Sequence, residues 1–248
     1  MDSGLYAVLT GWVARSQALD LAANNLANVS TTGFKAEREF YRSFEASARR
    51  LGLTSLNRAV NDYGVLGGAS IDLHAGSTEK TGNDLDVALE GSGFLVAKTG
   101  AGERYTRDGN LSIGPTGLLV TSAGDPVLGE EGPIQIPNGK ISISPDGTLS
   151  SDGAVVAKLR LADFAPGVQL TEEGHTYFAA PKGSEQPASS PDLRQGFVES
   201  SNLNPVEGAV NLIELQRQAG LLQRALSIFH NDFNRTAVQE LPTVQNVQ

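Results

Sequence analysis

Residues 212–233, LIELQRQAGLLQRALSIFHNDF, decide the fold, because their apolar side chains recur with the spacing of a coiled-coil helix. The series consists of Leu212, Leu215, Ala219, Leu222, Leu226, Phe229 and Phe233, which alternate steps of three and four residues. This spacing predicts a helix that begins near Pro205, with Asn204 as its N-cap, and ends near Glu240. An isolated helix cannot bury such a stripe, so the pattern predicts a partner helix as well.

The N-terminal end of the chain carries a similar but less regular pattern. Its apolar positions recur every seven residues, at Leu5, Trp12, Leu19 and Leu26. They predict a helix from about Ser3 to Asn28, although Arg15 interrupts the second row of the repeat. Both stripes have the alternative of packing on the core of their own domain. Their positions at the two chain ends favour pairing with each other, followed by packing against other chains.

The middle of the chain consists of short strand-like segments separated by turn signals. Pro115-Thr116-Gly117 and Pro145-Asp146-Gly147 lie between strand-like flanks, as tight hairpin turns do, and Asp152-Gly153 is a further turn signal. Turn signals that recur about every 8–12 residues are typical of an antiparallel β domain. A fold of alternating strands and helices would need longer segments between its turns. Before this region, residues 35–50 are expected to form a second short helix, and isolated strands are expected near residues 64–73.

The predicted fold class is α+β, in which the N- and C-terminal helices pair as a coiled coil and an antiparallel all-β domain lies between them. The expected divisions are an N-terminal helical segment at 1–50, an extended connector at 51–84, a β-rich outer domain at 85–200 and a C-terminal coiled-coil helix at 201–248. Residues 1–50 and 205–248 together are expected to form a helical core domain.

Composition excludes several classes of function. The chain has 19 Lys and Arg residues against 28 Asp and Glu residues, a net charge of −9, and no basic stripe, so we expect no nucleic-acid partner. It contains no cysteine, which excludes disulfides, thiolate metal sites and cysteine nucleophiles. No apolar run approaches the length of a membrane span, and the first residues lack the pattern of a Sec-type signal peptide.

A search for catalytic motifs finds none that is complete. The three histidines, His74, His175 and His230, lie in unrelated contexts without metal-ligand spacing. Residues 91–94, GSGF, resemble a phosphate loop but lack its lysine and following helix, so they are interpreted as a turn before a buried strand. No catalytic, cofactor-binding or metal site is therefore expected.

An acidic group at Asp84, Asp86 and Glu90 is the remaining candidate for chemistry. In a strand these positions share one face, and we expect that face to be solvated. A β-domain hydrolase that uses Asp84 and Asp86 stays open as an alternative, as does a secreted β-domain binding module anchored by its terminal helices.

Five sequence segments resemble, in the same order, those of the bacterial flagellar basal-body rod and hook proteins. They are LAANNLANVSTTGFK at 21–35, LDVALEGSGF at 85–94, YTRDGN at 105–110, GLLVT at 117–121 and GFVESSNLN at 196–204. The chain length and the segment at 126–137 are most similar to the proximal-rod (F-type) branch of this family. A distal-rod or hook-type axial protein is the alternative within it.

The resemblance implies a non-enzymatic structural subunit, without a cofactor, in the rod that crosses the periplasm and transmits torque. It implies copies of itself and other rod subunits as partners, together with the flagellar type III export apparatus. The expected assembly interface combines the two apolar stripes with three asparagines of the N-terminal motif. Its members are Leu5, Trp12, Leu19, Leu26, Asn24, Asn25, Asn28, Leu212, Leu215, Leu222, Leu226, Phe229 and Phe233.

Overall fold

The structure is a computed structural model that describes residues 2–42, 65–174, 176–188 and 191–240. The chain divides into two compact units, a helical unit and a β unit. The helical unit comprises Met1–Asn24, Arg38–Ala69 and Val206–Gln248, and the β unit comprises Asn25–Glu37 and Ser70–Pro205. Each unit therefore contains segments from distant parts of the sequence.

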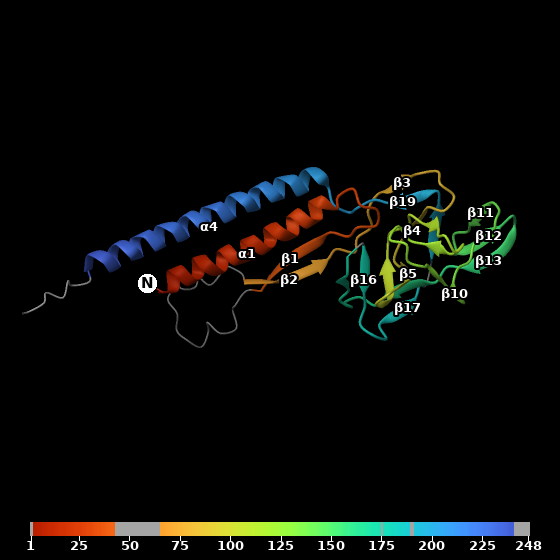
Figure 1. The fold of residues 1–248 in the computed structure, drawn as a ribbon, viewed down its shortest axis with the longest axis horizontal. Coiled ribbons are helices and arrows are strands. Elements are labelled where there is room, and N and C mark those ends of the chain that lie inside the picture. Colours follow the sequence, from red (N-terminus) through yellow and green to blue (C-terminus); the bar gives the residue numbers. More distant parts are fainter. Residues whose placement is uncertain (1, 43–64, 175, 189–190, 241–248) are drawn as a thin grey trace, which may run out of the picture. The chain divides into compact units, whose positions relative to one another are not determined.

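Two long helices form most of the helical unit: α1 at Asp2–Ala27 and α4 at Pro205–Glu240 (Figure 1). They run antiparallel, since Gly11 lies opposite Leu222 whereas Ala18 and Ala22 pack with Leu215. The two predicted terminal helices are confirmed, as is the β-rich region between them. Within the described residues, neither helix has an apolar stretch long enough to cross a membrane.

Strands β1 at Glu37–Arg42 and β2 at Val65–Ile71 pair with each other as a two-stranded sheet. The expected helix at 35–50 is therefore wrong over residues 37–42, and its remainder lies outside the described residues. The aromatic pair Phe40-Tyr41 favours a strand, and β2 supplies the backbone partners that a strand needs. The strand expected near residues 64–73 is confirmed by β2.

The β unit is built around a six-stranded sheet in the order β15-β16-β6-β5-β14-β17, with antiparallel neighbours throughout. Its strands are β5 at Phe94–Thr99, β6 at Gly102–Thr106, β14 at Leu161–Phe164, β15 at Thr171–Glu172, β16 at Tyr177–Ala179 and β17 at Glu185–Pro187. A second sheet has the order β11-β12-β13. Its strands are β11 at Ile141–Ile143, β12 at Thr148–Ser151 and β13 at Ala154–Lys158.

Four strand pairs complete the unit, and all are antiparallel. They are β3 at Thr78–Lys80 with β19 at Phe197–Glu199, β4 at Val87–Glu90 with β18 at Asp192–Gln195, β7 at Ser112–Ile113 with β8 at Leu119–Val120, and β9 at Leu128–Gly129 with β10 at Gly132–Pro133. The hairpin turns predicted at 115–117 and 145–147 are confirmed, because β7 pairs with β8 and β11 with β12.

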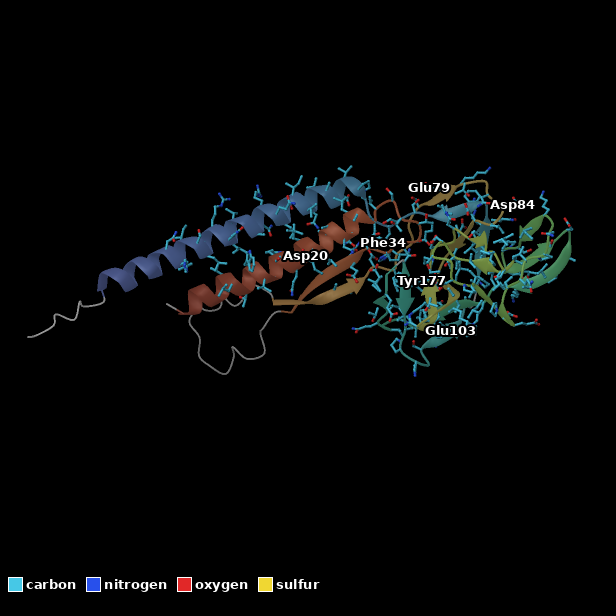
Figure 2. All side chains as sticks on the ribbon, in the orientation of Figure 1. Asp20, Phe34, Glu79, Asp84, Glu103 and Tyr177 are labelled. Atoms are coloured by element: carbon cyan, nitrogen blue, oxygen red, sulfur yellow. The ribbon has the colours of Figure 1, made fainter. Side chains whose placement is uncertain are left out.

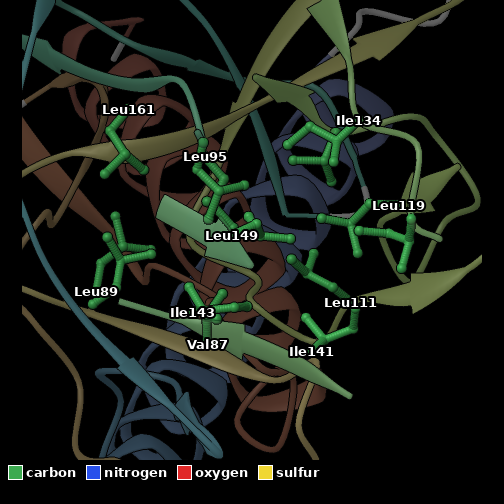
Figure 3. Packing of buried hydrophobic residues seen from close by; sticks show 14 residues of the cluster. Val87, Leu89, Leu95, Leu111, Leu119, Ile134, Ile141, Ile143, Leu149 and Leu161 are labelled. Atoms are coloured by element: carbon green, nitrogen blue, oxygen red, sulfur yellow. The ribbon is translucent and has the colours of Figure 1, made fainter. Parts of the chain in front are cut away.

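Strand β5 lies between two hydrophobic clusters because its side chains alternate between the faces of the sheet. Leu95 belongs to the larger cluster, which gathers around Leu149 (Figure 3). Phe94 and Val96 belong to the second, in which Phe94 and Phe178 make an edge-on contact at 5.7 Å between ring centroids. Burial of Phe94 confirms the interpretation of residues 91–94 as a turn before a buried strand.

The expected solvated face at Asp84, Asp86 and Glu90 is wrong at Asp86, which is 4% exposed. Asp84 is exposed and Glu90 is half-buried. Strand β4 is covered on both faces, since Val87, Ala88 and Leu89 are all buried, so alternation did not identify an outer side. Asn83 donates its Nδ2 to Asp86 Oδ1 at 3.0 Å, which satisfies the buried carboxylate.

Candidate assembly surface and polar junction

The buried face of α1 is made of small residues. Gly11, Ala14, Ala18, Ala22 and Asn25 follow one line along the helix, which we call the small-residue stripe. Ala14, Ala18 and Ala22 are at most 7% exposed. This line lies about 90° around the helix from the row of large apolar residues that the sequence repeat emphasised. Small side chains on this face allow the neighbouring backbone to approach closely.

The large apolar residues of α1 consequently lie at the margin of the contact or outside it. Leu19 is partly buried against the cluster of Ala18, Ala22 and Leu215, and Leu26 is half-buried. Trp12 is exposed, at 37%. The side chain of Leu5 lies outside the described residues.

On α4, the expected residues form an inner stripe that consists of Leu212, Leu215, Ala219, Leu222 and Leu226. Leu215 is buried, and the other four are half-buried. Phe229, at the margin of this stripe, is 45% exposed. The side chain of Phe233 lies outside the described residues.

A second apolar row on α4 was missed by the sequence analysis. The outer stripe consists of Val206, Val210, Ile213, Leu221 and Ile228, all of which are exposed. At about 100° per residue, it lies on nearly the opposite side of the helix from the inner stripe. The alternating steps of three and four residues identify only the face of the inner stripe. The positions of all apolar residues of α4, taken at about 100° per residue, identify both faces. Figure 2 shows side chains projecting along α4.

The three motif asparagines have different surroundings. Asn24 is exposed and Asn28 is half-buried. Asn25 is buried and holds the backbone of Glu37: its Oδ1 accepts from Glu37 N at 3.0 Å, and its Nδ2 donates to Glu37 O at 2.8 Å. Asn25 therefore joins the end of α1 to the start of β1 within the β unit.

Residues 28–36, which we call the elbow, follow α1 and include three buried side chains. Phe34, labelled in Figure 2, is 2% exposed, and Lys35 is 1% exposed. Gly33 has φ of +70°, and its N–H donates to Glu199 O at 2.7 Å. A side chain at Gly33 would overlap the backbone of Arg107 and Asp108, so both the conformation and the close approach require glycine here.

Lys35, Arg107 and Glu199 form what we call the polar junction. Lys35 Nζ donates to Glu199 Oε1 at 2.5 Å and to His74 O at 2.7 Å. Arg107 NH1 donates to Glu199 Oε2 at 3.2 Å, and its NH2 donates to Gly91 O at 2.7 Å. The three side chains are at most 4% exposed, so this is a buried network of two cations on one carboxylate.

Neighbouring backbone groups complete the junction. Gly76 N donates to Glu199 Oε1 at 2.8 Å, which gives that oxygen a second donor. Asn202 accepts from Ala36 N at 2.8 Å through Oδ1 and donates Nδ2 to Asp72 O at 2.7 Å. The elbow is thus hydrogen-bonded to segments from both before and after the β domain.

Burial shifts the ionisation of several groups in this region. Desolvation lowers the pKa of Lys35, although the hydrogen bond and charge of Glu199 oppose the shift. Desolvation raises the pKa of Asp108, against the stabilising hydrogen bonds from Ser122 and from the backbone of Asn110. It also raises the pKa of Glu37. The charged form of Lys35 therefore depends on Glu199.

The arrangement offers little for catalysis. Among the described residues, no group of three His, Asp or Glu side chains is placed to hold a metal ion. A cavity of about 830 Å³ in the β unit has among its lining residues charged groups that bind one another. In it, Arg160 donates to Glu103 at 3.1 Å and to Glu185 at 2.7 Å.

Comparison with known proteins matches the same segments that meet in the junction. Residues 5–35 match the flagella basal body rod protein family, residues 88–151 match the flagellar hook protein FlgE/F/G D1 domain, and residues 194–218 match the flagellar basal body rod FlgEFG protein C-terminal domain. Lys35, Arg107 and Glu199 lie one in each matched range. The two terminal matches and the match within the β region together place the chain in the class of axial proteins of the bacterial flagellum.

Curated relatives give the particular branch. The chain is 36% identical to the flagellar basal-body rod protein FlgF of Caulobacter vibrioides over 222 residues, 88% of this chain and 89% of the relative. It is 35% identical to FlgF of Salmonella typhimurium over 90% of this chain and 93% of the relative, and 33% identical to FlgF of Escherichia coli over 93% and 96%. The chain belongs to the flagellar basal-body rod protein family and, within it, to the F type.

Family membership defines the protein as a structural component of the flagellar basal-body rod and not an enzyme. It assembles with other flagellar axial proteins. The hydrolase and the secreted binding module are accordingly not favoured.

Proposed function

We propose that the subunit enters the rod through its terminal helices, with α1 and the inner stripe of α4 forming a coiled-coil seam and the outer stripe of α4 packing against neighbouring subunits. The observation that carries this proposal is the two-sided apolar pattern of α4, because one partner helix covers only one of the two faces. The expected interface residues on the inner stripe are retained, and the outer stripe is added to them.

Exposure of large apolar side chains supports the second contact. On α4, Ile213 is 63% exposed and Val206 is 70% exposed. On α1, Trp12 together with Leu9 and Val13 is also exposed. Exposed apolar side chains grouped on one face of a helix are typical of a protein interface, although the exposed Arg217 and Arg224 lie on the same face of α4 between Ile213 and Ile228. Burying the exposed part of each apolar side chain stabilises the contact by about 1 kcal/mol.

The seam within one subunit is small, which suits a chain that folds fully only on incorporation. Its buried cluster consists of Ala18, Ala22 and Leu215, and alanine contributes little apolar area. We propose that the helices are weakly held in the free subunit, that the chain passes unfolded through the flagellar type III export apparatus, and that neighbouring subunits complete the helical contacts. The assignment of residues 85–200 as an outer domain of the rod stays a prediction.

The seam is tested by replacing Leu222 and Phe229 with aspartate in the full-length chain. A charge beside the Gly11–Leu222 contact disfavours pairing with α1, so incorporation into rods should fall by about 10-fold or more while the β unit keeps its structure. Incorporation is measured in purified basal bodies from cells that lack the unsubstituted protein, and folding by circular dichroism.

Gln223→Asp is the control, since Gln223 is exposed and its replacement places one of the two new charges next to Leu222 but outside the inner stripe. It should assemble normally. Normal incorporation of the Leu222→Asp and Phe229→Asp chain would show that the seam is wrongly assigned.

A further inference from the structure

We propose that the polar junction is a latch that positions the elbow for assembly: Glu199, contributed by the C-terminal strand β19, must dock before Lys35 and the elbow can be fixed. The inference rests on the proposed function, because it assigns to Lys35, Glu199 and Arg107 the role of positioning residues for the same helical assembly. These residues act by ordering the segment that leads from α1 to β1.

The sequence separation of the partners carries the first step. Lys35 and Glu199 are 164 positions apart, and Arg107 and Glu199 are 92 apart. In a chain that enters the rod unfolded, each cation obtains its carboxylate only when the loop between that cation and Glu199 closes. The complete junction therefore forms only after the β unit has brought β19 to both the Lys35 and the Arg107 segments.

The charge balance carries the second step. Two buried cations bind one buried carboxylate. Lys35 contacts one oxygen of Glu199 and Arg107 contacts the other, so Glu199 is the partner of both cations. Loss of Glu199 removes the carboxylate that both cations bind and leaves Asp72 as the remaining negative charge acting on Lys35, but loss of Lys35 leaves the Arg107–Glu199 pair intact. The latch is thus asymmetric, with Glu199 as its central member.

The backbone contacts carry the third step. Glu199 also holds the elbow through its own carbonyl, which accepts from Gly33 N at 2.7 Å. Asn202, three residues further, accepts from Ala36 N at 2.8 Å. Docking of residues 199–202 therefore orders the elbow from Gly33 to Ala36 through both side chains and backbone.

The test uses three full-length variants: Glu199→Gln, Lys35→Met and the double variant. Hydrogen exchange of the Gly33 and Ala36 amides should accelerate by about 100-fold or more in Glu199→Gln, and less in Lys35→Met. In the double variant exchange should be slower than in Glu199→Gln alone, because only Arg107 then lacks the carboxylate that it binds. Rod incorporation should follow the same order, while exchange in β5 changes little.

Glu90→Gln is the control, because Glu90 pairs with Arg194 at 2.6 Å between strands but both side chains are more than 40% exposed. It should leave elbow exchange and incorporation unchanged. Unchanged elbow exchange in Glu199→Gln, or a double variant at least as impaired as Glu199→Gln, would overturn the charge-coupled latch. Normal incorporation despite a loosened elbow would overturn its role in assembly but leave the helical interface standing, which the Leu222 and Phe229 substitutions test separately.

Discussion

Replacing Gly33 by alanine is expected to lower the free energy of unfolding of the β unit by about 3 kcal/mol or more. Two effects add. Gly33 has φ of +70°, which other residues adopt at a cost, and a Cβ there would overlap the backbone of Arg107 and Asp108. Because neither backbone segment can move like the end of a flexible side chain, the elbow itself has to shift, which breaks the hydrogen bond from Gly33 N to Glu199 O. Denaturant unfolding measures the loss.

Gly82→Ala separates the two effects. Gly82 has φ of +76°, but a Cβ there would meet no atom within 4 Å. It therefore carries only the conformational cost, about 1 kcal/mol. Equal losses for Gly33→Ala and Gly82→Ala would contradict the close packing of the elbow against residues 107–108.

Replacing Val210 and Ile213 by aspartate is expected to reduce rod incorporation by about 100-fold or more, without lowering the stability of the free subunit. In the free chain these side chains are 52% and 63% exposed, so a charge there displaces little buried contact. In an apolar contact between subunits, the same two charges would be desolvated without partners. Incorporation into basal bodies and thermal unfolding of the purified chain measure the two quantities.

Gln216→Asp provides the comparison, because Gln216 is exposed and lies between the two apolar stripes around the helix. It adds a charge to α4 without entering either stripe and should assemble normally. The substitutions at Val210 and Ile213 could instead destabilise the free subunit enough to account for the whole loss of incorporation. In that case the outer stripe is an internal contact and not an interface.

The helices were predictable from local pattern, and their packing only partly so. Periodicity placed α1 and α4 within about two residues of their observed bounds, because the apolar repeat and the proline at the start of α4 are local signals. The contact face of α1 was not predicted, since it is made of alanine, which a search for large apolar residues overlooks. Ala18 and Ala22 are buried, whereas Trp12 is exposed.

The β region shows where local pattern fails. Turns at 115–117 and 145–147 follow from proline and glycine, but β1 depends on pairing with β2 across a gap in sequence. The polar junction was missed for a similar reason. Lysine, arginine and glutamate are usually exposed, and nothing local indicates that Lys35 meets Glu199. Lys35, Arg107 and Glu199 each lie in a different family-matched segment, and this was the one sign that they belong together.

Photo-crosslinking from position 213 tests the central claim most directly. A photoreactive residue replaces Ile213 in the full-length chain, and assembled rods are irradiated and analysed for linked products. If the outer stripe faces neighbouring subunits, position 213 links to another axial subunit, and the same residue at position 216 links far less. Products confined to the chain's own residues, in rods that contain the substituted subunit, would contradict assembly through the outer face of α4.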